Sequence, residues 1–126
     1  MTKFKTTLLL TLLCAFMFSG CKKDNPRDKF IGTFNVLGNC QSNPYQVIIE
    51  ASSVEDNYLN VKNLYADSAT VLGVMNGDLG VRINTQLVGN VTYAGEMYFD
   101  ENGKSTGSWF LYKNGVKCNG IITRIQ

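Results

Sequence analysis

The stretch VTYAGEMYFDENGKSTGSWFLYKNGVKCNGIITRI, Val91–Ile125, decides the fold, because it reads as three strands joined by two short turns. In Val91–Phe99, apolar residues alternate with polar ones, which predicts a strand with one buried face. Asn102-Gly103 and Asn114-Gly115 supply the positive φ angles that tight hairpins need. Short connections make successive strands antiparallel neighbours, so the stretch predicts a meander.

The same pattern continues upstream. In Tyr45–Ser52, Val47 and Ile49 share a face opposite Glu50, and Asn76-Gly77 marks another turn. No helical period follows Gly32, while Asn25-Pro26 predicts one short helical turn before it. The eight predicted strands are Thr33–Asn39, Tyr45–Ser52, Tyr58–Leu64, Ala69–Met75, Leu79–Asn84, Val91–Phe99, Ser105–Tyr112 and Lys117–Ile125.

The first twenty residues read as a secretory leader. Lys3 and Lys5 precede an uncharged run, residues 6–18, which is too short to cross a bilayer because spanning takes about 20 apolar residues. Ser19-Gly20-Cys21 then resembles the lipobox of bacterial lipoproteins. The resemblance implies that the Cys21 thiol receives a diacylglyceryl group, that cleavage removes residues 1–20, and that the new amino terminus is acylated. The alternative is a plain secretory signal that happens to end beside a cysteine.

A charged tether is expected between the lipid and the domain. The run KKDNPRDK carries six charges in eight residues, which is typical of solvated chain. Residues 21–27 are assigned to the tether and residues 28–126 to the domain. Because Lys22 follows the cysteine, the resemblance implies transfer to the outer membrane. Charged tethers of this kind also resemble surface-export tags, which favours the cell surface over the periplasmic face.

The amino-acid composition argues against several classes of function. Of 12 Lys+Arg and 10 Asp+Glu, the leader holds Lys3 and Lys5, which leaves ten of each sign in the mature chain. A nucleic-acid partner is not expected without a basic excess. The chain has no His, so it lacks the commonest general base and the commonest metal ligand. We therefore expect no cofactor and no metal.

The cysteines favour a closed sheet. Cys14 leaves with the leader and Cys21 carries lipid, so Cys40 and Cys118 remain in an oxidising compartment and are expected to pair; two buried thiols are the alternative. A disulfide needs Cα atoms within about 7 Å, whereas the outer strands of an open eight-strand meander lie roughly 30 Å apart. The pair therefore predicts an up-and-down barrel, which has no edges.

An immunoglobulin-type sandwich is the rival architecture. It would place a Trp on a central strand, packed against the bridge. Trp109 does lie between the two cysteines, but it comes only nine residues before Cys118.

From Asp28 onward the chain resembles the small lipocalin-like (calycin) barrels of bacterial lipoproteins. The matching motifs are DKFIGTF, Asp28–Phe34, and KCNGIITRI, Lys117–Ile125. The resemblance implies a short helix at one end of the barrel and an Arg of the last strand lying over an aromatic ring of the first. Phe34 and Arg124 occupy those places, with Phe instead of the usual Trp. The alternative is that Phe34 is ordinary core and Arg124 is solvated.

An eight-stranded barrel has an interior barely wide enough for side chains, so a filled barrel is expected and a ligand pocket is the second hypothesis. The expected filling residues are Tyr45, Tyr93, Met97, Phe99 and Phe110.

The sequence offers few candidate catalytic or modified residues. Glu55-Asp56 and Asp100-Glu101 are carboxylate pairs, but each lies beside turn residues, where acids bond their own backbone. We therefore expect no catalytic residue and no enzyme. Asp67-Ser68-Ala69 resembles an O-glycosylation motif of exported Gram-negative proteins, with Ser68 as the acceptor.

The expected function is a non-catalytic binding module for a small apolar ligand, attached to the outer membrane by its lipid. The alternative is a protein-interaction or inhibitor subunit with a filled barrel and no ligand, which would use another surface protein as its partner. Its exposed contacts would include Tyr58, Tyr65 and Tyr112.

Overall fold

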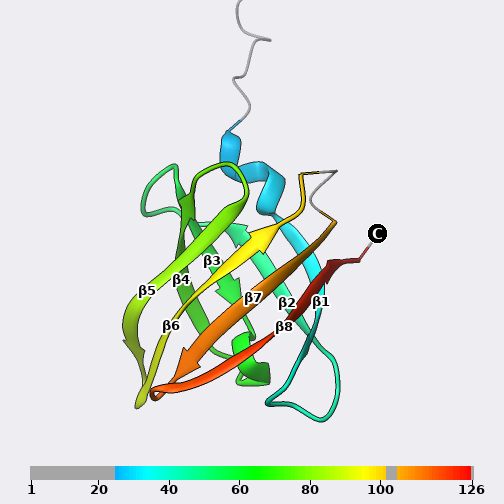
Figure 1. Ribbon diagram of the computed structural model, residues 1–126. Helices are drawn as coiled ribbons and strands as arrows, with labels where there is room; N and C mark the ends of the chain where they lie inside the picture. The colour runs from blue at the N-terminus through cyan, green and yellow to red at the C-terminus, as the bar shows by residue number, and fades with distance from the viewer. Residues whose placement is uncertain (1–24, 102–104, 126) are drawn as a thin grey trace, which may run out of the picture.

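The computed structural model describes residues 25–101 and 105–125, which form a closed barrel of eight antiparallel strands (Figure 1). Each strand pairs with the next, and β8 returns to pair with β1. The all-β class and the up-and-down topology are confirmed, and the sandwich alternative is wrong. The elements are η1 (Pro26–Phe30), β1 (Gly32–Gly38), β2 (Tyr45–Ala51), β3 (Tyr58–Lys62), η2 (Leu64–Ala66), β4 (Thr70–Asn76), β5 (Gly80–Val88), β6 (Val91–Phe99), β7 (Thr106–Lys113) and β8 (Val116–Arg124).

Several predictions fall outside the described residues. These are the signal peptide 1–20, the lipid at Cys21 and the turn at Asn102-Gly103.

The seam between β1 and β8 closes the barrel. Phe34 pairs with Arg124 and Leu37 with Ile121 in an antiparallel register. The predicted disulfide between Cys40 and Cys118 is confirmed, with Cα atoms 5.7 Å apart. Backbone pairing and a covalent link therefore hold the same seam.

β5 is longer than predicted, because a bulge interrupts its alternation. The strand runs on to Val88 rather than ending at Asn84, and its register with β6 shifts between Ile83 and Gln86. An extra residue in one strand breaks the two-residue period, which hides the continuation in the sequence. The Gln86 amide then replaces the missing backbone pairing to β4, since it bonds both the N–H and the C=O of Leu72 at 2.8 Å.

Side chains from every strand fill the interior. The buried apolar residues are Phe30, Phe34, Val36, Val47, Ile49, Leu59, Val61, Leu64, Tyr65, Val71, Val81, Ile83, Tyr93, Met97, Phe99, Trp109, Leu111, Cys118 and Ile122. Two of the residues expected to fill the interior do not lie fully inside it. Tyr45 is only half-buried, and Phe110 points outward while Trp109 and Leu111 on either side of it point inward. Phe110 packs outside near Tyr112, and the Lys117 Nζ lies 5.2 Å from its ring centroid.

The short N-terminal helix is a 3-10 helix, capped as predicted. The Asn25 side chain accepts a hydrogen bond from the Arg27 N–H, and Phe30 is fully buried against Phe99, with ring centroids 5.5 Å apart. η1 therefore packs as part of the core at its end of the barrel.

The folded domain begins earlier than the predicted boundary at Asp28. Arg27 Nη1 donates to the carbonyls of Ser52, Glu55 and Tyr58 at 2.8–3.1 Å. The Asn25 amide also donates to the Asp56 carbonyl at 3.0 Å. Residues 25–27, assigned to the tether, are thus part of the domain, because one guanidinium organises a whole connection between strands.

Candidate functional site

The barrel has two distinct ends (Figure 1). The η1 end carries η1, the connections 52–57 and 77–79, and residues 100, 101 and 105 between β6 and β7. The η2 end carries the connections 39–44, 63–69, 89–90 and 114–115. The described chain begins with Asn25 and η1, so the η2 end lies at the opposite end of the barrel from this start (Figure 1).

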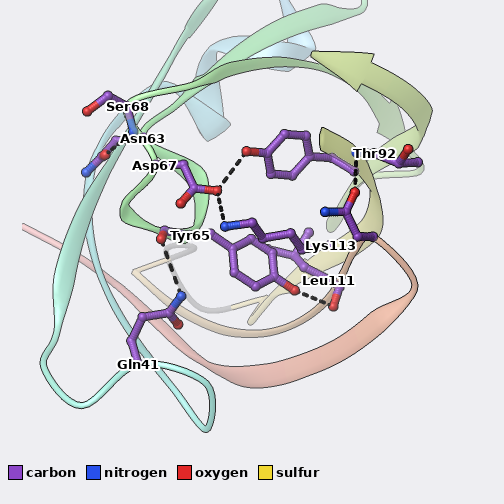
Figure 2. A network of polar contacts seen from close by, with 10 residues as sticks. Gln41, Asn63, Tyr65, Asp67, Ser68, Thr92, Leu111 and Lys113 are labelled. Atoms are coloured by element: carbon purple, nitrogen blue, oxygen red, sulfur yellow. Dashed lines mark hydrogen bonds and ion pairs between the residues drawn. The ribbon is translucent and has the colours of Figure 1, made fainter. Parts of the chain in front are cut away.

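Segment 63–69 folds across the mouth of the barrel at the η2 end (Figure 2). It joins the neighbouring strands β3 and β4, and the Asn63 N–H donates to the Ala69 carbonyl at 2.8 Å. Leu64 and Tyr65 are only 1% and 5% exposed, so this connection contributes to the core instead of looping into solvent. The expectation that Tyr65 is an exposed contact is therefore wrong, because its ring is inserted into the barrel.

The backbone of this segment is strained. Asn63, Tyr65, Ala66 and Ser68 have φ between +57° and +66°. This left-handed region is natural for Gly and tolerated by Asn, but a bulky residue such as Tyr65 rarely adopts it. Residues held there cost on the order of 1–3 kcal/mol each, and they persist only where surrounding contacts fix them.

Two hydrogen bonds fix Tyr65 to other parts of the barrel. Its hydroxyl donates to the Leu111 carbonyl on β7 at 2.6 Å. Its own carbonyl accepts from Gln41 Nε2 at 3.3 Å. Segment 63–69 is therefore attached both to the opposite wall and to the connection after β1 (Figure 2).

Asp67 makes the third attachment. Its Oδ2 accepts a hydrogen bond from the Tyr93 hydroxyl on β6 at 2.8 Å and pairs with Lys113 Nζ on β7 at 2.7 Å. The same ammonium lies 5.6 Å from the Tyr65 ring centroid. One carboxylate thus ties the segment to β6 and β7 (Figure 2).

The tyrosines of this end stay protonated at neutral pH. Burial raises the pKa of Tyr45 and of Tyr65 to about 12. Burial also raises the pKa of Tyr93 to about 12, and its hydrogen bond to Asp67 adds to the shift. Their hydroxyls are therefore neutral hydrogen-bonding groups, suited to holding a structure or a ligand.

A hollow of about 340 Å³ opens beside segment 63–69. Its walls include the disulfide, Gln41, Tyr65, Lys113 and Asn114. Gln41 Oε1 is buried without a hydrogen-bond partner in the part of the chain that the structure describes. Buried polar atoms normally have partners, so this end has unused hydrogen-bonding capacity.

The predicted pair Phe34 and Arg124 meets at the opposite end. The Arg124 guanidinium carbon lies 4.8 Å from the Phe34 ring centroid, and its nitrogens donate to the carbonyls of Ile31 and Lys29 at 2.7 and 2.5 Å. A Cβ on Gly32 would lie 2.5 Å from Arg124 Nη1, so the glycine leaves the room this contact needs. Arg124 is therefore a closing contact and not a solvated terminus.

Ser68 is exposed beside Asp67, and its N–H donates to Asn63 Oδ1 at 2.9 Å. Glu55-Asp56 lies on the connection that Arg27 holds, and the Thr106 hydroxyl bonds Asp100. Within residues 25–101 and 105–125, no three potential metal-ligating side chains gather. The Asp100 carboxylate thus bonds the start of β7, whereas Glu55 and Asp56 contribute backbone carbonyls to the contacts with Arg27 and Asn25.

Sequence reasoning missed the contacts that Gln41, Asp67, Tyr93 and Lys113 make. In the sequence, Asp67 stands out only as the neighbour of Ser68, and Tyr93 only as a residue expected to fill the interior. No local pattern marks these residues, because they meet only when segment 63–69 crosses the barrel.

No family model and no curated protein matches this sequence. Among solved structures the chain is similar to a redesigned β-barrel, with a TM-score of 0.51 and 14% identity over 84% of this chain and 100% of that chain. At this identity the likeness shows the fold alone: a small closed antiparallel β-barrel. Over the described ranges, no helix is both long and apolar enough to span a membrane.

Proposed function

We propose that this chain is a lipid-anchored, non-catalytic binding module of the outer membrane that holds its ligand at the η2 end. The observation that carries the proposal is the strained segment 63–69, fixed across the barrel mouth beside a hollow that includes the unpartnered Gln41 Oε1. Backbone strain of this kind concentrates at functional sites.

The expected anchor gives the module an orientation. Three residues lie between Cys21 and Asn25, and the four Cα–Cα steps of this stretch span at most about 14 Å. The η1 end therefore stays close to the bilayer. The η2 end faces outward, which is where a ligand or partner arrives.

A small, largely apolar ligand is the first candidate, because the side chains packed behind segment 63–69 are apolar. A protein partner is the second candidate. It is favoured by large apolar side chains exposed around the η2 end, with Leu37, Leu87 and Val116 each more than half exposed. A filled barrel without a ligand agrees with this second candidate.

The anchor is tested by replacing Cys21. Cys21→Ala is expected to move the protein from the membrane fraction to the soluble fraction and to remove acyl chains from its intact mass. Protease treatment of whole cells then distinguishes the surface from the periplasmic face. An unchanged membrane fraction would contradict the lipid anchor.

The site is tested on mature protein purified from its native host. Native mass spectrometry is expected to detect a bound small molecule that Gln41→Ala reduces and that Asp78→Ala, at the η1 end, leaves unchanged. If no small molecule is present, a photo-reactive residue at Val116 or at Asp78 compares the ends in intact cells. Cross-links from position 116 alone support the protein partner, and equal or absent cross-links contradict binding at the η2 end.

A further inference from the structure

Segment 63–69 covers the barrel without being part of its wall. β3 and β4 already pair as far as Lys62 and Thr70, and the Asn63 N–H closes their hairpin on Ala69. The wall is therefore complete without the five residues 64–68. These residues add only the inserted side chains of Leu64 and Tyr65 to the interior.

Two opposing influences act on the segment. Four left-handed non-glycine residues favour its release. The attachments to Gln41, Tyr93, Leu111 and Lys113 favour its closed position. Because all of these partners belong to other elements, the segment can leave without breaking the strand ladders of the barrel.

The space that the Tyr65 side chain occupies is surrounded by groups of defined chemistry. The Tyr65 ring lies between Tyr93 and Trp109, with centroid separations of 6.3 and 6.4 Å. Its hydroxyl reaches the Leu111 carbonyl at 2.6 Å. The space it occupies is bordered by two aromatic rings and one hydrogen-bond acceptor, and the Lys113 ammonium lies 5.6 Å from the centre of the ring. A neutral aromatic ring with one hydroxyl donor fits this environment.

We propose that segment 63–69 is a displaceable plug, and that a small neutral aromatic molecule with one hydroxyl group takes the place of the Tyr65 side chain when the plug withdraws. This inference rests on the proposed function, since it names a ligand class for the η2 end. The closed barrel described above is the ligand-free state, and binding shifts the population toward the open one.

The probe is p-cresol, which has the structure of a tyrosine side chain. In a titration of the mature domain followed by amide NMR, saturable shifts are expected at Trp109 and Leu111 and throughout segment 63–69. Toluene, which lacks the hydroxyl, is expected to bind more weakly, because it cannot donate to the Leu111 carbonyl.

Two variants should change the affinity in opposite directions. Asp67→Ala removes the attachments to Tyr93 and Lys113, so it raises the open population and tightens p-cresol binding about fivefold or more. Ala66→Gly relieves strain in the closed plug, since Gly adopts φ of +58° freely, and weakens binding about fivefold. Glu50→Gln removes the exposed Glu50–Lys62 ion pair on the outer wall and should leave the affinity unchanged.

The proposal is overturned if p-cresol causes no saturable shifts in either the wild type or Asp67→Ala. It is also overturned if the affinity is the same in all variants, because the probe then binds elsewhere. If Asp67→Ala does not fold, the weaker p-cresol binding expected for Ala66→Gly still tests the plug. If p-cresol does not bind but a native ligand or a cross-link is still found at the η2 end, the plug is overturned. The proposed function is then unaffected.

Discussion

Cys40 and Cys118 are 78 residues apart in the sequence, yet their Cα atoms lie 5.7 Å apart across the seam between β1 and β8. Next to them the Asn39 N–H donates to the Asn119 carbonyl, and the Asn119 N–H donates to Asn39 Oδ1. Arg124 holds the other end of the seam through the carbonyls of Ile31 and Lys29. The seam is thus held at both ends of the barrel.

Replacing both seam cysteines by Ser should lower stability without opening the barrel. The free energy of unfolding is expected to fall by about 2–4 kcal/mol, because the unfolded chain regains the freedom that a 78-residue loop closure removes. Urea unfolding followed by circular dichroism measures this, with reduced wild type as the control. Unchanged stability, or loss of the β spectrum in the double variant, would contradict the prediction.

The two neighbours Leu111 and Phe110 test the inward and outward faces of β7. Leu111→Ala should destabilise the domain by about 2–5 kcal/mol, because it leaves a cavity in a filled core. Phe110→Ala should cost about 1 kcal/mol, because the ring lies outside beside Lys117. Thermal and urea unfolding compare the two variants. The reverse order would show that the strand faces are assigned incorrectly.

Residues 25–27 should stabilise the domain although they precede the predicted boundary. A chain that starts at Asp28 is expected to lose about 1–3 kcal/mol relative to one that starts at Lys22, because the bonds from Asn25 and Arg27 to the connection 52–57 disappear. Hydrogen exchange should quicken at Tyr58, whose N–H bonds the Glu55 carbonyl. Arg27→Ala in the longer chain should reproduce most of the change. Equal stability of both chains would place residues 25–27 in the tether after all.

Stability should fall steeply at alkaline pH. The pKa of Tyr45, Tyr65 and Tyr93 is about 12 in the folded domain, against about 10 in an unfolded chain. Above about pH 10 the unfolded state releases protons that the folded state keeps, so this contribution is full below pH 10 and is lost as pH rises towards 12. Unfolding free energies and tyrosinate absorbance measured across this range check the prediction.

The matched variant for the alkaline experiment is Tyr93→Phe. It removes one of the three raised groups, so its stability should depend less steeply on pH in the same window. An identical slope in the variant would show that Tyr93 does not contribute.

Local patterns in the sequence determined most of the strands. Val91–Phe99 has the same bounds in the structure as in the prediction. At Asn114-Gly115 both residues have positive φ, 50° and 80°, as a tight hairpin requires. These features depend on residues close together in the chain, so composition and period suffice to find them. Closure also followed from the sequence, because two cysteines at opposite ends of the meander can bond only if its outer strands meet.

Only the tertiary structure decided the parts that depend on register and on distant contacts. The bulge in β5 shifted the alternation beyond Ile83, and the pairing of β7 with β6 and β8 set the outward face of Phe110. The meeting of Asp67 with Lys113 joins residues 46 positions apart across the barrel mouth. No sequence period encodes such a meeting, because a side chain's partner across a barrel is set by where the whole sheet closes and not by its neighbours along the chain.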